Sequence, residues 1–487
     1  MNTDRVLDGL KATLVARACK MVANAALLVL LANVFLTPRE YGLLFLALSI
    51  VGVAKLLGSL GLGRSAAYFV TKFSESDPGQ VPAVIRISLT YRLLLVGVVA
   101  GALALGSGLL GTALGEPALA PVLVVGAGYL VASSIHSFNA NLFQAFNRVP
   151  VSGAVNVVQQ VVRAICVIGL VAAGGGVVAA IFGYLLGAAV SALLGGAILY
   201  RRFYADHEDD GGDPELRSRI LRYSVPLTAS SAANVLDKRI DTVLIGYFLT
   251  PVDVSFYVLS KQVSEFALVP AGALGFSVSP TFGEEKAKGT LARAGRLYES
   301  SLQYVLLLYV PAAVGIALVA GPLLRYGVGR EYLGAVPVLQ LFGIYVLFQA
   351  ITNVTTQSLD YLGRARERAI AKGVTSVANV LLNVALIPAY GVVGAAAATV
   401  VTFGAYTAGN VFLIHQELPL DTRTLATTAA ASGLISGGMG AAVLWLRPHV
   451  TGVVTLLGVV ALGVGIWAVL ATVSGLLKPR RAASMLR

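Results

Sequence analysis

The sequence predicts an all-α integral membrane protein with about fourteen transmembrane helices: two six-helix lobes that are parallel repeats, followed by two C-terminal helices. Three observations predict this fold class. Of the 487 residues, 57% are hydrophobic and only 12% are charged, whereas soluble domains carry about 25% charged residues. Apolar stretches long enough to cross the hydrocarbon core, about 20 residues, recur along the whole chain. Several short segments of the first half also recur in the second half.

The apolar stretches define the expected elements in order. The first six candidate spans lie near residues 12–36, 41–61, 84–108, 119–140, 149–173 and 177–200. A charged linker, RRFYADHEDDGGDPELRSR, follows at 201–219. Six more spans lie near 221–249, 253–281, 298–320, 332–357, 366–388 and 392–415, and the last two near 424–446 and 451–477. The predicted domains are an N-terminal six-helix lobe at 1–200 and a cytoplasmic interlobe linker at 201–219. A C-terminal six-helix lobe follows at 220–415, and two extra helices with a basic cytoplasmic tail at 416–487.

The basic residues predict the orientation of the spans. An even number of spans places both termini on one side, and that side carries 26 lysines and arginines, against four on the other. Positive charge accumulates in short cytoplasmic loops, so we expect both termini in the cytoplasm and the protein in the plasma membrane. The net charge of +12 is explained by these loops, so no nucleic-acid partner is expected. The first apolar run carries Arg17 and Lys20 and continues past any short signal core, so no cleavable signal peptide is expected.

One short sequence motif, expected to form a turn, occurs twice in the chain. The letters FLTP occur at 35–38 and at 248–251. Thr37 suits a helix N-cap and Glu40 the third helical position, which predicts a capping box, and Thr250 and Asp253 are placed in the same way. Segment 176–188 likewise resembles segment 391–405, and the turn with Arg148 matches the turn with Arg364.

The repeat predicts two copies of a six-span unit that insert the same way up. Such copies are related by an axis along the membrane normal, as in transporters that rock about a central site. A bare repeat also suits a scaffold, and this alternative stays open.

Six lysines and arginines that are not assigned to either membrane side lie inside the predicted spans, together with three acidic residues. They are Lys55, Arg92, Arg163, Lys238, Arg239, Lys261, Asp237, Asp241 and Glu265. A charge at the centre of a membrane helix costs about 2.5–3.5 kcal/mol, so such residues usually face a water-filled cavity or a partner.

Several of these charges have a purely structural interpretation. Arg92 can snorkel to the membrane surface, and Lys238 can neutralise Asp237 or Asp241 on the same helix. Lys261 and Glu265 are four residues apart and can pair with each other. Lys55 has no acidic neighbour on its own span and is the hardest of the basic residues to explain this way.

Two further groups of polar residues share helix faces. Span 5 carries a polar stripe that includes a cation: Asn156, Gln160 and Arg163. The matching stripe on span 11 carries no charge: Ser376, Asn379 and Asn383. Arg17, Lys20 and Asn24 share one face of span 1, where the two cations can simply anchor the helix among lipid headgroups.

The functional hypothesis is a central cavity with a cationic lining. Its candidate substrate-binding residues are Arg17, Lys20, Asn24, Lys55, Arg163 and Lys261. Lysine and arginine form charge-assisted hydrogen bonds to phosphate, so a cavity of this sign predicts an anionic cargo such as a phosphate-bearing headgroup.

The sequence resembles the multidrug/oligosaccharidyl-lipid/polysaccharide (MOP) exporter superfamily, and within it the polysaccharide-type flippases of lipid-linked oligosaccharides. The resemblance covers essentially the whole chain. It rests on FLTPREYGLLFLALS, on YSVPLTASSAANVLDKRIDTVLIGYFLTPVDVSFYVLS and on LIPAYGVVGAAAATVV. Asp241 occupies the position of an aspartate near the outer end of the family's seventh helix.

The resemblance implies fourteen helices in two lobes that open alternately inward and outward. It implies a cargo of glycan on a polyprenyl or dolichyl phosphate or diphosphate, moved from the cytoplasmic to the outer leaflet. In similar flippases, basic residues on helices 1, 2 and 8 face the cavity, which corresponds here to Arg17, Lys20, Lys55 and Lys261. The last two helices are expected to form a groove for the lipid tail.

No cofactor or metal is expected. The two cysteines, Cys19 and Cys166, both lie in apolar segments, so neither a disulfide nor a cysteine metal site is predicted. Transport coupled to protons, sodium or the membrane potential remains open, with Asp237, Asp241 and Glu265 as candidate coupling residues, because burial raises the pKa of a carboxyl group while neighbouring cations oppose that shift. The expected partners are the lipid-linked glycan, membrane lipids and glycan-assembly proteins, and the protein is expected to be a monomer.

Three other functions agree with the sequence less well. A drug or cation antiporter of the same superfamily usually has twelve helices and an acidic or apolar site, which fits the basic residues less well. A glycan polymerase or ligase needs a sizeable external loop, whereas the longest external stretch is short, near GPLLRYGVGREYLG, and no catalytic motif is found. A scaffold in an envelope-glycan complex would tolerate loss of Lys55, Arg163 and Lys261. We therefore expect a transporter and not an enzyme.

Overall fold

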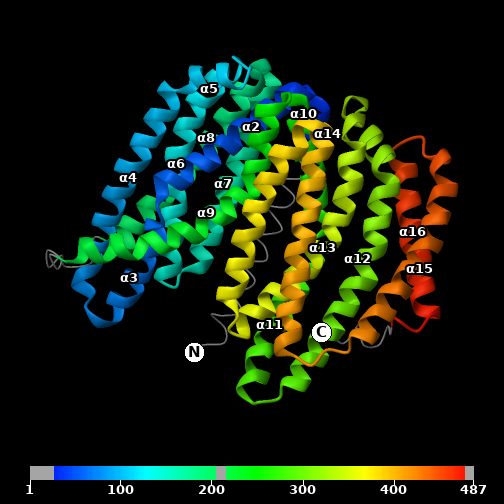
Figure 1. Ribbon diagram of the computed structural model, residues 1–487. Coiled ribbons are helices and arrows are strands. Elements are labelled where there is room, and N and C mark those ends of the chain that lie inside the picture. The colour runs from blue at the N-terminus through cyan, green and yellow to red at the C-terminus, as the bar shows by residue number, and fades with distance from the viewer. Residues whose placement is uncertain (1–26, 205–214, 478–487) are drawn as a thin grey trace. The chain divides into compact units, whose positions relative to one another are not determined.

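The computed structural model describes residues 27–204 and 215–477, and every regular element in this part of the chain is a helix (Figure 1). Contacts between helices divide the chain into two compact units. Unit 1 is Met1–Ser255 and unit 2 is Phe256–Arg487. The all-α prediction is therefore confirmed for the described residues.

Unit 1 contains the helices from α2 to α9 and the start of α10. Their bounds are α2 (Pro38–Ser59), α3 (Leu62–Ser76), α4 (Val81–Leu105), α5 (Ser107–Ala113), α6 (Leu119–Ala145), α7 (Val149–Leu170), α8 (Gly176–Leu199), α9 (Leu216–Phe248) and α10 (Pro251–Ala267). A short π-helical segment, Leu31–Phe35, precedes them. α6 packs against α2, α3, α4, α7 and α8, and α9 packs against α2 and α3. The contacts thus divide the chain after Ser255, and the lobe boundaries expected from the sequence, at the 201–219 linker, stay a prediction.

Unit 2 contains the rest of α10 and the helices that follow it. Their bounds are α11 (Val269–Ala287), α12 (Leu291–Gly327), α13 (Val336–Tyr361), α14 (Ala365–Glu417), α15 (Thr422–Leu446) and α16 (Val453–Val473). α13 packs against α11, α12 and α14, and α15 packs against α12 and α16. The buried core lies mainly among α11, α12 and α13, around Phe282, Tyr298 and Val346.

Within the described residues, nine helical segments are long and apolar enough to cross a membrane. The two longest, Val149–Tyr204 and Ala365–Glu417, are each interrupted by a glycine with non-helical backbone angles. Gly176 has φ 57° and ψ −150°, and Gly391 has φ 62° and ψ −147°. This region of backbone conformation is essentially confined to glycine, so each segment is divided into two helices where the sequence predicts a break.

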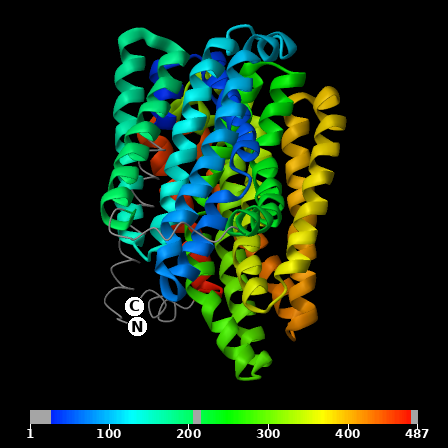
Figure 2. The same ribbon diagram turned by 90° about the vertical axis from the view of Figure 1, so that its left-hand side faces the viewer.

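The parts on either side of each break pack against each other. α7 packs along α8 (Figure 2), and a Cβ atom built on Gly183 of α8 would lie 2.6 Å from the backbone nitrogen of Val167. Within α14, Asn379 Nδ2 donates to Thr402 Oγ1 at 3.2 Å, which joins the two parts that are drawn in yellow to orange in Figure 1. These two hairpins occupy matching places in the two halves of the sequence.

The two FLTP turns form the capping boxes that the sequence predicts. The Thr37 N–H donates to Glu40 Oε2 at 3.0 Å, and the Glu40 N–H donates to Thr37 Oγ1 at 3.3 Å. The second copy repeats both bonds, from the Thr250 N–H to Asp253 Oδ2 at 3.2 Å and from the Asp253 N–H to Thr250 Oγ1 at 3.4 Å. Each box satisfies amide groups at a helix start that have no partner inside the helix.

The first copy also lies in direct contact with the second. A Cβ atom added to Gly42 of α2 would lie only 1.7 Å from the backbone oxygen of Pro251. No side chain fits at such a distance, so only glycine allows α2 to approach the second turn this closely.

We therefore expect Gly42→Ala to destabilise unit 1 by about 1–3 kcal/mol, the usual cost of forcing an extra group into a packed interior. The measurement is the midpoint of thermal unfolding of the purified protein in detergent. Gly97→Ala on α4 is the matched control, because a Cβ atom there meets nothing within 4 Å and alanine favours a helix more than glycine does. An unchanged midpoint for Gly42→Ala would contradict the close contact.

Candidate functional site

Lys55 is bound by neutral oxygen atoms of unit 1. It lies on α2, and its Nζ donates to the backbone oxygen of Ser133 at 2.8 Å and to Ser137 Oγ at 2.8 Å, both on α6. Within residues 27–204 and 215–477, no carboxylate lies within 4 Å of this ammonium group. The side chain is half-buried in the packed interface between α2 and α6.

Two arginines lie within electrostatic range of the Lys55 ammonium, Arg92 and Arg239. Arg92 on α4 is only 3% exposed; its Nε donates to Ser134 Oγ at 3.0 Å, and its guanidinium lies over the Phe138 ring at 5.6 Å. The snorkelling interpretation of Arg92 is therefore wrong, because this side chain lies on the face of α4 that packs against α6.

Arg239 is brought to the same place by the packing of α9 against α2. A Cβ atom on Gly52 would lie 3.3 Å from Arg239 Nε, so the arginine lies over a glycine one helical turn before Lys55. In the described part of the chain, neither Arg92 nor Arg239 has a carboxylate within ion-pair distance. The absence of a side chain on Gly52 makes room for the guanidinium group.

A fourth cation of unit 1, Arg163, lies on α7. Its guanidinium lies over the Tyr184 ring at 4.9 Å, and Tyr184 meets Tyr129 edge-on at 5.9 Å between centroids. Tyr129 lies within electrostatic range of both Arg163 and Arg239. We call Lys55, Arg92, Arg163 and Arg239 the cationic cluster.

Neutral polar groups surround the cationic cluster. His136 of α6 is 6% exposed, and its Nε2 is 3.1 Å from Asn156 Oδ1. Its Nδ1 atom and the Oε1 atom of Gln160 are buried and have no hydrogen-bond partner among the described residues. Buried like charges repel one another and lose hydration, so an anion bound beside Lys55 and Arg92 would be stabilised.

The structure brings together some of the predicted site residues and not others. Lys55 and Arg163 belong to the cationic cluster. Lys261 lies in unit 2, with its Nζ over the Tyr257 ring at 5.5 Å, and Glu265 on the same helix is exposed. The predicted residues Arg17, Lys20 and Asn24 lie outside the described residues.

The candidate coupling residues on α9 differ in burial. Asp241 is 1% exposed and Asp237 is half-buried, and neither is free of interactions. Their role in ion coupling stays a prediction.

Arg92 and Arg239 were missed as site residues. In the sequence, Arg239 lies within DKRID, and its charge was attributed to neutralisation by the neighbouring aspartates. In the structure Lys238 is exposed, whereas Arg239 is half-buried. Arg92 had a weak signal in Ser88, a polar residue one turn earlier that is also buried. The polar face that Ser88 and Arg92 share on α4 is the signal that could have identified Arg92.

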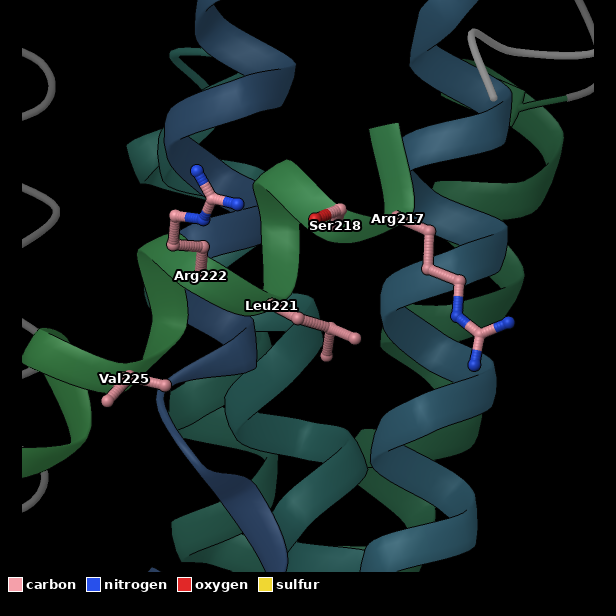
Figure 3. Close-up of a pocket in the computed structure, with 5 residues that line it drawn as sticks. All are labelled: Arg217, Ser218, Leu221, Arg222 and Val225. Carbon is pink, nitrogen blue, oxygen red and sulfur yellow. The ribbon is translucent and has the colours of Figure 1, made fainter. Parts of the chain in front are cut away.

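A separate open hollow lies at the start of α9 (Figure 3). It is lined by Arg217, Ser218, Leu221, Arg222 and Val225. The side chains of Arg217 and Arg222 point to opposite sides, and Arg217 lies over the Tyr91 ring at 4.9 Å. The two guanidinium groups therefore do not converge on one ligand, and this hollow is no counterpart of the cationic cluster.

Comparison with known proteins agrees with this description. A family model described as "Polysaccharide biosynthesis protein" matches residues 6–284, more than half of the chain. The chain belongs to this family. A second model, MatE, matches residues 226–385, and together the two confirm the resemblance to the MOP exporter superfamily.

Two curated relatives come from Haloferax volcanii. The probable flippase AglR is 31% identical over 211 residues, which are 42% of this chain and 43% of that protein. The probable low-salt glycan biosynthesis flippase Agl15 is 27% identical over 188 residues, 39% of this chain and 40% of that protein. The chain thus spans about two fifths of the length of the curated relatives it matches.

A solved structure of the lipid II flippase MurJ in an inward closed conformation shares the fold. Its TM-score is 0.76 at 15% identity, and the match covers 96% of this chain and 98% of that one. The chain is therefore an all-helical, multi-pass membrane protein with a MurJ-like fold.

The cationic cluster predicts that an anion stabilises the purified protein. We expect millimolar inorganic diphosphate to raise the midpoint of thermal unfolding, since a ligand at ten times its Kd adds about 1.4 kcal/mol. Lys55→Gln is expected to remove most of this shift, and Lys72→Gln, an exposed lysine on α3, is expected to keep it. An equal response in wild type and Lys55→Gln would show that diphosphate acts elsewhere.

Proposed function

We propose that this protein flips a lipid-linked oligosaccharide from the cytoplasmic to the outer leaflet of the cell membrane. The cargo is a glycan on a polyprenyl or dolichyl phosphate or diphosphate, and it passes by alternating access through a cationic central cavity. Family membership and the flippase names of AglR and Agl15 support the class of cargo. The cationic cluster supports its charged part.

The proposal depends above all on the surroundings of Lys55. Among the described residues, this lysine within a membrane-crossing helix hydrogen-bonds to a hydroxyl and a backbone oxygen and to no carboxylate, so a ligand can supply the anionic partner. Phosphate oxygens accept hydrogen bonds from lysine and arginine more strongly than neutral acceptors do. A phosphate therefore offsets the lost hydration of this group.

The proposal includes the topology expected from the sequence. Fourteen spans in two parallel six-helix repeats and two extra helices would place both termini in the cytoplasm. The paired capping boxes at Thr37 and Thr250 and the nearly equal backbone angles of Gly176 and Gly391 support the repeat. In each case the same local structure recurs at the matching place in the second copy.

The proposed mechanism also assigns roles to the other candidate residues, to the lipid tail and to the two lobes. Arg17, Lys20 and Asn24 on the first helix and Lys261 on α10 extend the cationic lining. The isoprenoid tail stays in the lipid while the lobes rock. Asp237, Asp241 and Glu265 are the candidates for coupling to protons or sodium, and the chain acts as a monomer without a cofactor.

The decisive test is Lys55→Gln in proteoliposomes that contain a fluorescent lipid-linked oligosaccharide. A charge-assisted hydrogen bond contributes about 1.5–3 kcal/mol, so we expect the rate of flipping to fall by about ten- to a hundredfold. Dithionite quenching of the outward-facing dye measures this rate. Lys72→Gln should flip at the wild-type rate, and wild-type flipping by Lys55→Gln would refute the proposal.

A drug antiporter of the same superfamily is the second candidate, because the MatE model matches residues 226–385. The two functions are separated by accumulation of a cationic dye in an efflux-deficient host. We expect expression of this protein to leave dye accumulation unchanged, since a cluster of four cations repels a cationic drug. Dye efflux that is lost in Lys55→Gln would favour the antiporter.

A further inference from the structure

Three amide side chains form a ladder along α13 in unit 2. Gln349, Asn353 and Gln357 are spaced four residues apart and therefore share one helix face. Gln349 Nε2 donates to Asn353 Oδ1 at 3.5 Å, and Gln357 Nε2 donates to the Asn353 backbone oxygen at 3.1 Å. Ser279 of α11 donates through its Oγ to Gln357 Oε1 at 3.1 Å. We call these four residues the amide ladder.

The amide ladder keeps hydrogen-bonding capacity that unit 2 does not use. Gln349 Oε1 is buried and has no partner among the described residues, and Asn353 Nδ2 makes no hydrogen bond to them. All three amides are half-buried in a helix that is apolar enough to cross a membrane. An amide without a partner in such a place costs several kcal/mol, so these atoms need water or a polar ligand.

Unit 1 has a stripe at the corresponding place on α6. Ser133, Ser137 and Asn141 have the same four-residue spacing. A Cβ atom on Gly63 would lie 2.6 Å from Asn141 Nδ2, just as a Cβ atom on Gly275 would lie 2.8 Å from Gln357 Nε2. The two stripes thus meet a neighbouring helix in the same way.

The two stripes differ in charge. In unit 1, Lys55 hydrogen-bonds to Ser133 and Ser137. In unit 2, no lysine or arginine among the described residues hydrogen-bonds to the amide ladder. The first stripe therefore presents a cation, and the second presents neutral groups that both donate and accept.

We propose that the amide ladder of unit 2 binds hydroxyl groups of the cargo's glycan. This inference rests on the proposed function. A sugar hydroxyl donates one hydrogen bond and accepts others, and a carboxamide offers both kinds of partner, whereas a phosphate oxygen only accepts and calls for a cation. The ladder rises about 6 Å from one amide to the next, so it contacts more than one hydroxyl along a glycan.

The test compares two probes on the full-length protein in detergent. One is a polyprenyl diphosphate that carries a neutral trisaccharide, and the other is the same polyprenyl diphosphate without sugar. Gln349→Met removes the unpartnered Oε1 while nearly keeping the side-chain shape. We expect it to weaken binding of the glycan-bearing probe by about three- to tenfold, the effect of a lost hydrogen bond of about 1 kcal/mol, and to leave binding of the sugar-free probe unchanged.

Gln340→Met is the matched control on the same helix. Gln340 is exposed and lies nine residues before Gln349, on the opposite face of α13, where it donates to the Ala317 backbone oxygen at 3.3 Å. This variant should bind both probes like wild type. Lys55→Gln should weaken binding of both probes, because both carry the diphosphate.

Asn353→Leu provides a second variant, and thermal unfolding shows whether each variant is folded. Selective loss of the glycan-bearing probe in either folded variant supports the ladder. Equal loss of both probes, or loss of neither, overturns it while leaving the proposed function intact. If wild type binds neither probe, the proposed function itself fails.

Discussion

The function proposed for this protein depends on one interaction: among the described residues, the Lys55 amino group hydrogen-bonds to neutral oxygen atoms and to no carboxylate. Lys55 lies in a membrane-crossing helix, within electrostatic range of two other cations, Arg92 and Arg239. A protein that needed these charges only for stability would pair them with carboxylates, because an uncompensated charge is costly in a membrane segment. In the described part of unit 1 the pairing partner of Lys55 is not a carboxylate, so the compensating charge is expected from a ligand.

The two halves of the chain share a scaffold and differ in polarity. The α7–α8 hairpin of unit 1 carries Arg163 where α14 of unit 2 carries Asn379, and each residue lies at the crossing with the following helix. The stripes of α6 and α13 differ in the same way. Lys55 hydrogen-bonds to the first stripe, whereas amide and hydroxyl groups are the partners that the described residues supply to the second. At these matching positions of the sequence, unit 1 carries cations and unit 2 carries neutral polar groups.

Small residues make these arrangements possible. Gly187 allows α8 to approach α7 so closely that a Cβ atom would lie 2.7 Å from the Cβ of Arg163. Helices in membranes pack through such small residues because lipid tails provide no hydrophobic drive for association. The position of the Arg163 guanidinium over Tyr184 is therefore fixed by the backbone approach of two helices. Glycine positions that look unspecific in the sequence thus determine where the charges lie.

The sequence by itself determined the membrane class, the capping boxes at Thr37 and Thr250, and the breaks at Gly176 and Gly391. These features depend on the chemistry of a few neighbouring residues, so a local pattern is sufficient to predict them. Only the tertiary structure decided which charges meet. Arg92 and Arg239 lie on helices far from Lys55 in the sequence, and their approach depends on which helix faces pack against α2 and α6. A local pattern contains no information about such contacts between distant helices, which is why both arginines received a structural interpretation before the packing was known.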